Sequence, residues 1–399
     1  MDSSLNAAAL ALAHGDVLGA LNRVALRTDP SALAIHGTAM AQLGDFAQAR
    51  TLLRKAAQAF GRREEIARAR CVLAEAEIAL VSRDLAWPDQ RLEQARTTLL
   101  RRGDAGNAAH ATCISARLHL LLGQLDRATA ELATLRPVDL QPSTRAAWWL
   151  TTAGIHVRRI HARAAHRALS EARDAAHASA IPALLAEVEA AQQSLAGPAA
   201  FLTAEDTTTP ATLADVEQLF ASQTLVLDTL RATLRQGEKI ISFASRPVLF
   251  ALLHSLASGA DVNRENLLRQ AFGARHADES HRARLRVEIT RLRPLLEGLG
   301  EITATSAGYR LKTTQPIAIL SLPGLGQNSA VLALLSDGEL WSSSALAQVL
   351  QLSLRTVQRA LDELQRQARI QPIGNGRARR WTILALPGFP TTLLLPVQT

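Results

Sequence analysis

The sequence contains few cysteines, few aromatic residues and few lysines. Its only two cysteines among 399 residues, Cys71 and Cys113, stand far apart and form no CxxC pair. This spacing excludes a disulfide framework and a zinc site built from paired cysteines. Both lie in apolar helical patterns, so we expect two buried free thiols, which suits a reducing cytoplasm. A redox-sensing role is the alternative.

Long apolar runs are also absent. No stretch reaches the roughly 18 uncharged apolar residues of a membrane span. The first residues, Met1-Asp2-Ser3-Ser4, carry no basic region ahead of an apolar core, unlike a signal peptide. We therefore expect a cytoplasmic protein with no membrane partner.

The motifs of common enzyme classes are missing as well. There is no phosphate loop, no HExxH, no nucleophile elbow and no plausible catalytic triad. The isolated Gly374-Asn375-Gly376 lacks the rest of a nucleotide fingerprint and reads as a hairpin turn. His156, His161 and His166 are spaced by five, which places successive rings about 140° apart on a helix. We predict that the protein is not an enzyme and has no metal or cofactor.

Alanine and leucine dominate what is present. Hydrophobic residues make up 48% of the chain and aromatics 4%, a balance that favours helix over sheet. The length suffices for two or three domains.

A turn motif recurs in the N-terminal half. His14-Gly15-Asp16-Val17, Leu43-Gly44-Asp45-Phe46 and Leu122-Gly123-Gln124-Leu125 each precede a helix with a small residue near its start. Fainter copies surround Ala95 and Ala168. The helix after the second turn is amphipathic; its apolar positions are Ala49, Leu52, Leu53, Ala56, Ala57 and Phe60.

This pattern resembles the tetratricopeptide repeat family over residues 1–196. The resemblance implies an α-solenoid with a concave face that takes a peptide, protein or small-molecule effector. The alternative is an array that only dimerises or scaffolds. Residues 197–238 are predicted to be a polar linker, at 204–210, followed by a connecting helix over 213–235.

The charge is unevenly distributed. Residues 1–238 hold 25 basic and 25 acidic side chains, whereas residues 239–399 hold 19 and 11, so the whole excess of +8 lies in the second part. A localised basic excess is the electrostatic signature of a polyanionic partner.

A first module is predicted over 239–314. A strand at 239–243 precedes helices at 246–257, 264–272 and 280–296, and strand-prone residues flank a small turn at 302–311. The third helix has one apolar stripe, formed by Leu285, Ile289, Leu292 and Leu296. Its other faces carry Arg282, Arg284, Arg286, Thr290, Arg291 and Arg293. Such a helix can read the major groove of DNA; the alternative is a solvated face.

The module resembles the OmpR/PhoB-type winged-helix family, through Leu285-Arg286-Val287-Glu288-Ile289-Thr290-Arg291-Leu292-Arg293 and Gly308-Tyr309-Arg310-Leu311. The resemblance implies that Arg291 and Arg293 contact bases or phosphates and that Arg310 lies on a wing near the minor groove. Phe272 replaces the family's usual Trp, and Thr305-Ser306 stands where Arg-Gly is common.

A second module follows a connector at 315–327 and covers 328–386. Val331 to Leu335 mark one helix, Ser342-Ser343-Ser344 caps the next, and a recognition helix begins near Leu354. Its exposed start carries Ser353, Arg355, Thr356 and Arg359. A hairpin around Asn375-Gly376 carries Arg377, Arg379 and Arg380. This looks like the general bacterial winged-helix pattern; a protein-binding winged helix is the alternative.

The fold class is therefore expected to be mainly α: a tetratricopeptide-like α-solenoid followed by two small winged helix-turn-helix domains of α+β type. The apolar tail at 387–399 has no assigned role. The function expected is that of a bacterial transcriptional regulator that binds double-stranded DNA in a sequence-specific manner, as a homodimer on palindromic sites. The alternative is a scaffold whose winged helices bind protein.

Overall fold

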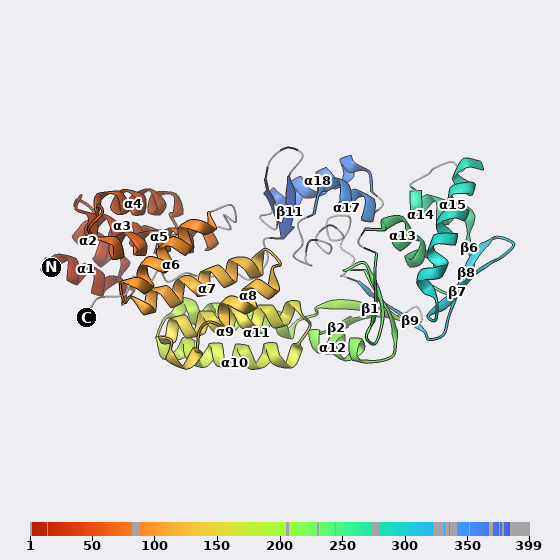
Figure 1. Cartoon of the computed structure of the whole chain (residues 1–399), viewed down its shortest axis with the longest axis horizontal. Coiled ribbons are helices and arrows are strands. Elements are labelled where there is room, and N and C mark those ends of the chain that lie inside the picture. Colours follow the sequence, from red (N-terminus) through yellow and green to blue (C-terminus); the bar gives the residue numbers. More distant parts are fainter. Residues whose placement is uncertain are drawn as a thin grey trace. The chain divides into compact units, whose positions relative to one another are not determined.

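The computed structural model describes residues 2–13, 15–81, 88–204, 207–229, 231–243, 245–272, 279–321, 331, 335, 341–350, 352–366, 370–374, 376 and 379–383. The chain is mainly helical, and all its described strands come after residue 199 (Figure 1). The chain forms two compact units. The helical unit comprises the residues up to His156 and Ala164–Ser194, and the mixed unit comprises Val157–Arg163 and Leu195–Leu386.

The helical unit is built from helices that pack on their sequence neighbours. From α1 to α8 each helix contacts the next, and α1, α3, α5 and α7 also contact one another in succession. The helices are α1 (Ser3–Ala13), α2 (Val17–Val24), α3 (Pro30–Gln42), α4 (Phe46–Ala59), α5 (Glu65–Val81), α6 (Asp89–Arg101), α7 (Ala105–Leu121), α8 (Leu125–Leu132), α9 (Pro142–Arg158), α10 (Ala162–Ser179) and α11 (Pro182–Ala196).

Glycine–aspartate turns begin several of these helices. Gly15, Gly44 and Gly103 have φ of 81°, 86° and 81°, which glycine adopts without steric cost. The aspartate that follows each glycine caps the next helix by accepting a hydrogen bond from the backbone N–H three residues on. The turn at Gly103-Asp104 is a copy of the motif that the sequence reading missed.

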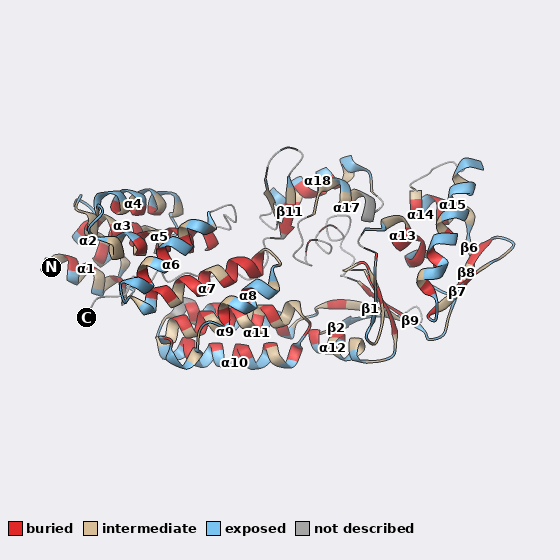
Figure 2. Cartoon of the chain, in the orientation of Figure 1, coloured by how far each residue is buried: buried red, intermediate tan, exposed pale blue. Residues whose placement is uncertain are grey.

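Small residues near the helix starts make close packing possible. Ala20, Ala49, Ala95, Ala128 and Ala168, the repeated positions of the sequence pattern, are all buried. On α4 the burial alternates with exposed polar residues as the apolar pattern predicts (Figure 2). The amphipathic reading of this helix is confirmed.

The mixed unit starts with a sheet where a linker and a helix were expected, so that prediction is wrong. Two strands, β1 (Ala200–Ala204) and β2 (Thr207–Ala211), pair across the predicted linker. The predicted helix over 213–235 ends early, as α12 (Leu213–Ala221), and β3 (Leu225–Asp228) and β4 (Thr233–Gln236) follow it. All four residues of β3 are buried, and a short apolar run of this kind fits a helix or a central strand equally well by periodicity.

Two predicted boundaries cut through this sheet. Its order is β2-β1-β9-β3-β4-β5, with β5 (Lys239–Ser242) at one edge and β9 (Ile317–Ser321) inside. The strand β9 pairs parallel with β3 and antiparallel with β1. The first module therefore does not begin at residue 239, and residues 317–321 of the predicted connector form a central strand; its residues 322–327 lie outside the described part.

Three helices and a hairpin complete this region. The helices are α13 (Pro247–Leu256), α14 (Arg264–Phe272) and α15 (Glu279–Leu292), which continues as a 3-10 turn over Arg293–Leu296. The strands β7 (Gly300–Ala304) and β8 (Gly308–Thr313) pair as a hairpin, and the short β6 (Val262–Asn263) joins β8. One core contains side chains from the sheet and from all three helices, among them Leu227, Leu234, Leu252, Leu268 and Ile289.

A second, smaller core forms near the end of the described chain. It is built by α17 (Ser343–Leu350), α18 (Leu354–Arg366) and the antiparallel strands β10 (Ile370–Ile373) and β11 (Arg380–Ile383). The helical residues Val331 and Leu335 are fully buried in it. Ser342 accepts a hydrogen bond from the N–H of Ala345, as expected for a cap. The apolar tail at 387–399 lies outside the described residues.

A search of the described helices finds none with the length and apolar character needed to cross a membrane.

Candidate nucleic-acid interface

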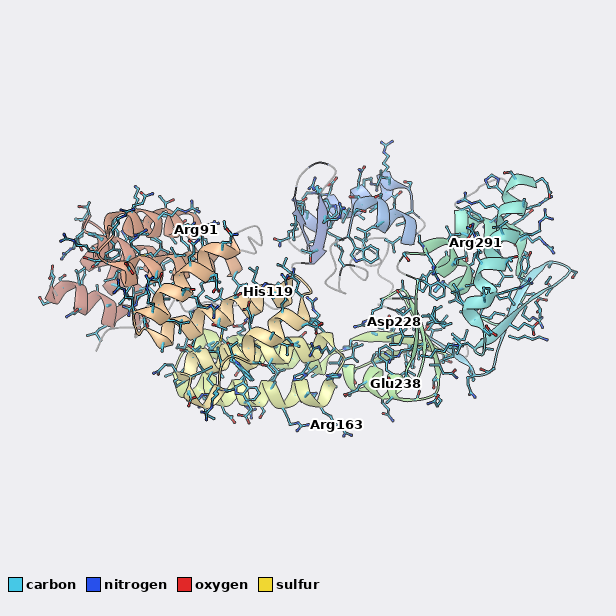
Figure 3. All side chains as sticks on the ribbon, viewed as in Figure 1. Arg91, His119, Arg163, Asp228, Glu238 and Arg291 are labelled. Atoms are coloured by element: carbon cyan, nitrogen blue, oxygen red, sulfur yellow. The ribbon has the colours of Figure 1, made fainter. Side chains whose placement is uncertain are left out.

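The helix α15 turns an apolar stripe inward and a basic surface outward. Leu285, Ile289 and Leu292 are buried in the core. Arg286 and Arg291 keep 62% and 66% of their side-chain surface exposed (Figure 3 labels Arg291). The division confirms the predicted stripe and leaves the outer face available to a partner.

Val287 lies at the centre of this outer face. It is two residues from both Leu285 and Ile289, which places it opposite the buried stripe at 3.6 residues per turn. Its side chain is 48% exposed although apolar. Thr290 is exposed beside it, and its hydroxyl donates to the carbonyl oxygen of Arg286. An apolar group flanked by arginines can contact a thymine methyl group while the arginines bind guanines or phosphates.

Two carboxylates pair with three of the arginines. Glu279 pairs with Arg282 at 3.5 Å and with Arg286 at 2.7 Å, and Glu288 pairs with Arg291 at 3.1 Å. The pairs of Glu279 are exposed, and such pairs contribute only about 0–1 kcal/mol each, so a phosphate group can replace this carboxylate at little cost. Glu288 keeps only 13% of its side-chain surface exposed, so its pair with Arg291 is partly buried.

Two other predicted contact residues already bind within the fold. The guanidinium of Arg284 lies 4.6 Å from the centre of the Phe272 ring, a cation–π contact. Arg293 lies in the 3-10 turn after α15, and its Nε donates to the carbonyl oxygen of Ile302 at 3.2 Å. Arg293 thus ties the hairpin to the helix.

The β7–β8 hairpin stands beside α15 and is held by charged side chains. Arg310 pairs with Asp261 at 2.9 Å. Arg264, which the sequence reading did not single out, donates to the carbonyl oxygens of Ser306 and Thr305 at 2.9 and 3.2 Å. These bonds fix the small turn that the sequence placed at Thr305-Ser306.

Gly308 is required for the hairpin to pair with β6. A Cβ at this position would lie 1.9 Å from the carbonyl oxygen of Val262 and 2.9 Å from the Cα of Asn263. Because both obstacles are backbone atoms, no side-chain movement relieves the clash.

Gly308→Ala is therefore expected to destabilise the mixed unit by about 1–3 kcal/mol, the usual cost of overpacking. The measurement is the thermal unfolding midpoint of the full chain. Ser306→Ala, an exposed change in the same turn, is the control and should leave the midpoint unchanged. Equal midpoints for Gly308→Ala and the wild type would show that the β6–β8 pairing is not as described.

Like α15, the shorter helix α18 has a buried apolar face and an exposed basic face. Val357, Leu361 and Leu364 are buried, whereas Arg355 and Arg359 are exposed. The hydroxyls of Ser353 and Thr356 lie 2.7 Å apart, and Ser353 accepts the N–H of Thr356. These two residues cap the helix and present its N-terminal turn, a position that favours anions.

The β10–β11 hairpin adds basic groups to this second surface. The guanidinium of Arg379 lies 4.3 Å from the ring centre of Trp381 and donates to Gln365. Trp381 is itself anchored, because its Nε1 donates to Ser343 at 2.9 Å. Arg380 is half-buried, and Arg377 lies outside the described residues.

No model of a known protein family matches the sequence, and no curated protein matches it significantly.

Cysteines and histidines are the remaining groups that the sequence singled out. Cys71 and Cys113 are buried free thiols, as predicted, and burial raises the pKa of each to about 12. A thiol with so high a pKa is a poor nucleophile. Over the described part of the chain, no group of three or more His, Cys, Asp or Glu side chains is arranged to hold a metal ion.

Proposed function

We propose that the protein is a sequence-specific DNA-binding transcriptional regulator with two winged helix-turn-helix modules and a tetratricopeptide-like helical array. The observation that carries the proposal is the outer face of α15, where exposed arginines flank Val287 and Thr290 next to a β-hairpin. Helix plus hairpin is the arrangement with which winged helices contact a groove and its flanking phosphates.

Two further observations, and one consequence of linking the two modules, support DNA as the partner. The second module repeats the arrangement, with exposed Arg355 and Arg359 on α18 and Arg379 on its hairpin. The excess of basic over acidic residues is confined to residues 239–399. Two linked modules would also raise affinity, since the second binds at a high effective concentration.

The test is a salt titration of the binding of the full chain to labelled duplex DNA, read by fluorescence anisotropy. Binding through about six or more phosphates should weaken by a factor of about 1,000 or more between roughly 50 and 200 mM salt. The scaffold alternative, in which these surfaces bind protein, predicts no measurable affinity for duplex DNA at the lower salt concentration.

A further inference from the structure

The helical unit contains a wide groove outside the proposed DNA-binding surfaces. Its volume is about 990 Å³; α4 and α6 form its walls and α5 its floor. Five arginines and two glutamates line it. The arginines are Arg54, Arg62, Arg68, Arg91 and Arg101 (Figure 3 labels Arg91).

The two glutamates lie toward opposite ends of the groove, and each pairs with two arginines. Glu75, whose side chain is fully buried, lies 2.9 Å from Arg54 and 3.4 Å from Arg91. Glu65 lies 2.9 Å from Arg101 and 3.1 Å from Arg102. Because ten residues of α5 separate the glutamates, the two ends are about 15 Å apart.

Positive charge is left over in the groove. Arg62 and Arg68 line it and are exposed, and neither has an ion pair within the part of the chain that the structure describes. The end at Glu65 also retains charge, since one carboxylate there faces the guanidinium groups of both Arg101 and Arg102. A guanidinium fork binds phosphate or carboxylate oxygens in pairs.

We propose that this groove binds a small organic anion with two or more phosphate or carboxylate groups, one group at each end. The apolar middle of the ligand would lie on Ala57, Ala69 and Val72, and Gln58, Gln94 and Thr98 offer hydrogen bonds between the ends. The groove volume is of the size that small-molecule sites have. The two glutamates disfavour the continuous phosphate backbone of a nucleic acid. This inference does not depend on the proposed DNA binding.

The test is isothermal titration calorimetry of the full chain at physiological salt with dodecanedioate, whose two carboxylates are far enough apart to reach both ends, and with pyrophosphate and citrate, which can occupy only one end. At least one probe should bind with a Kd below about 1 mM. The double variant Arg62→Ala/Arg68→Ala should weaken that binding by about tenfold, which is the loss of about 1.4 kcal/mol. Both residues are exposed and outside the buried pairs, so the variant should melt like the wild type.

The matched control is Arg63→Ala/Arg127→Ala, which removes the same charge from exposed positions outside the groove, one in a turn and one in a helix. It should retain the affinity within about twofold. No saturable heat with any probe would overturn the proposal, as would equal weakening in both variants. Displacement of the probe by duplex DNA, or by an acidic peptide, would reassign the groove to that partner. Failure of the chain to bind DNA would leave this result unaffected.

Discussion

Replacing Arg286 and Arg291 together by alanine is expected to weaken binding to a preferred duplex by about 2–6 kcal/mol, since each groove-reading arginine contributes about 1–3 kcal/mol. Both side chains are more than half exposed on the outer face of α15; their partner Glu279 is exposed, and Glu288 keeps 13% of its side-chain surface exposed. The fold should be retained, because the buried stripe of the helix is unchanged. The measurement is anisotropy on the preferred duplex and on a scrambled duplex.

The control for this prediction is the double variant Arg127→Ala/Arg136→Ala, which lowers the net charge equally at exposed positions of the helical unit. It should bind both duplexes nearly as the wild type does. If the two double variants lose the same affinity, the effect is one of total charge and α15 does not enter the groove. If Arg286→Ala/Arg291→Ala loses affinity on both duplexes equally, these arginines bind phosphates and do not read bases.

Breaking the ion pair between Arg117 and Glu187 is expected to cause the largest loss of stability. The two side chains are 8% and 2% exposed, and their atoms Nη2 and Oε1 lie 2.6 Å apart. Burial lowers the pKa of Arg117, while the charge of Glu187 opposes that change. Glu187→Leu alone would leave a guanidinium in the core and should cost about 3–5 kcal/mol. The measurement is urea unfolding of the full chain followed by circular dichroism.

The double variant Arg117→Met/Glu187→Leu tests whether the cost comes from the buried charge of Arg117 once Glu187 is removed. Because both charges are removed, it should regain most of the lost stability, and such replacements are sometimes more stable than the pair. A double variant as unstable as Glu187→Leu would show that packing between α7 and α11, and not the charge, sets the loss. Unchanged stability in the single variant would contradict the burial of the pair.

Where a helix has one clear apolar stripe, the periodicity of the sequence was sufficient to predict the position of the helix and its buried face. The helix α14 begins and ends at the predicted residues, and α15 begins one residue before the predicted start. The regularity of Leu285, Ile289 and Leu292 determines which face is buried, so the exposed arginines also followed from the sequence. The buried alanines near helix starts in the helical unit were predicted from a different local signal, the recurring turn that precedes each helix.

Short buried strands could not be predicted in this way. Leu225–Asp228 is a four-residue run whose pairing partners include Ile317–Ser321, about ninety residues later. No local pattern contains that pairing, so the run was assigned to a helix that in fact ends at Ala221. The capping box of Thr212 and Asp215 marks where this helix starts but not where it stops.

The partners of individual arginines could not be predicted either, because they too lie far away in the sequence or depend on the folded structure. Arg284 stacks on Phe272 and Arg293 binds the carbonyl oxygen of Ile302, although the sequence presented both as free to contact DNA. Arg264 was missed because its two acceptors are backbone carbonyls some forty residues later. The Gly103-Asp104 turn, in contrast, has the same local signal as its counterparts and could have been found.

The most direct measurement of the central claim is selection of a random-sequence duplex library with the full-length protein, followed by sequencing of the bound fraction. We expect a defined enriched motif, whose symmetry would report whether the protein binds as a dimer. In Arg286→Ala/Arg291→Ala, the part of the motif that α15 reads should lose its enrichment. A bound fraction with no enriched motif would contradict sequence-specific recognition by α15 and α18 and favour the scaffold alternative.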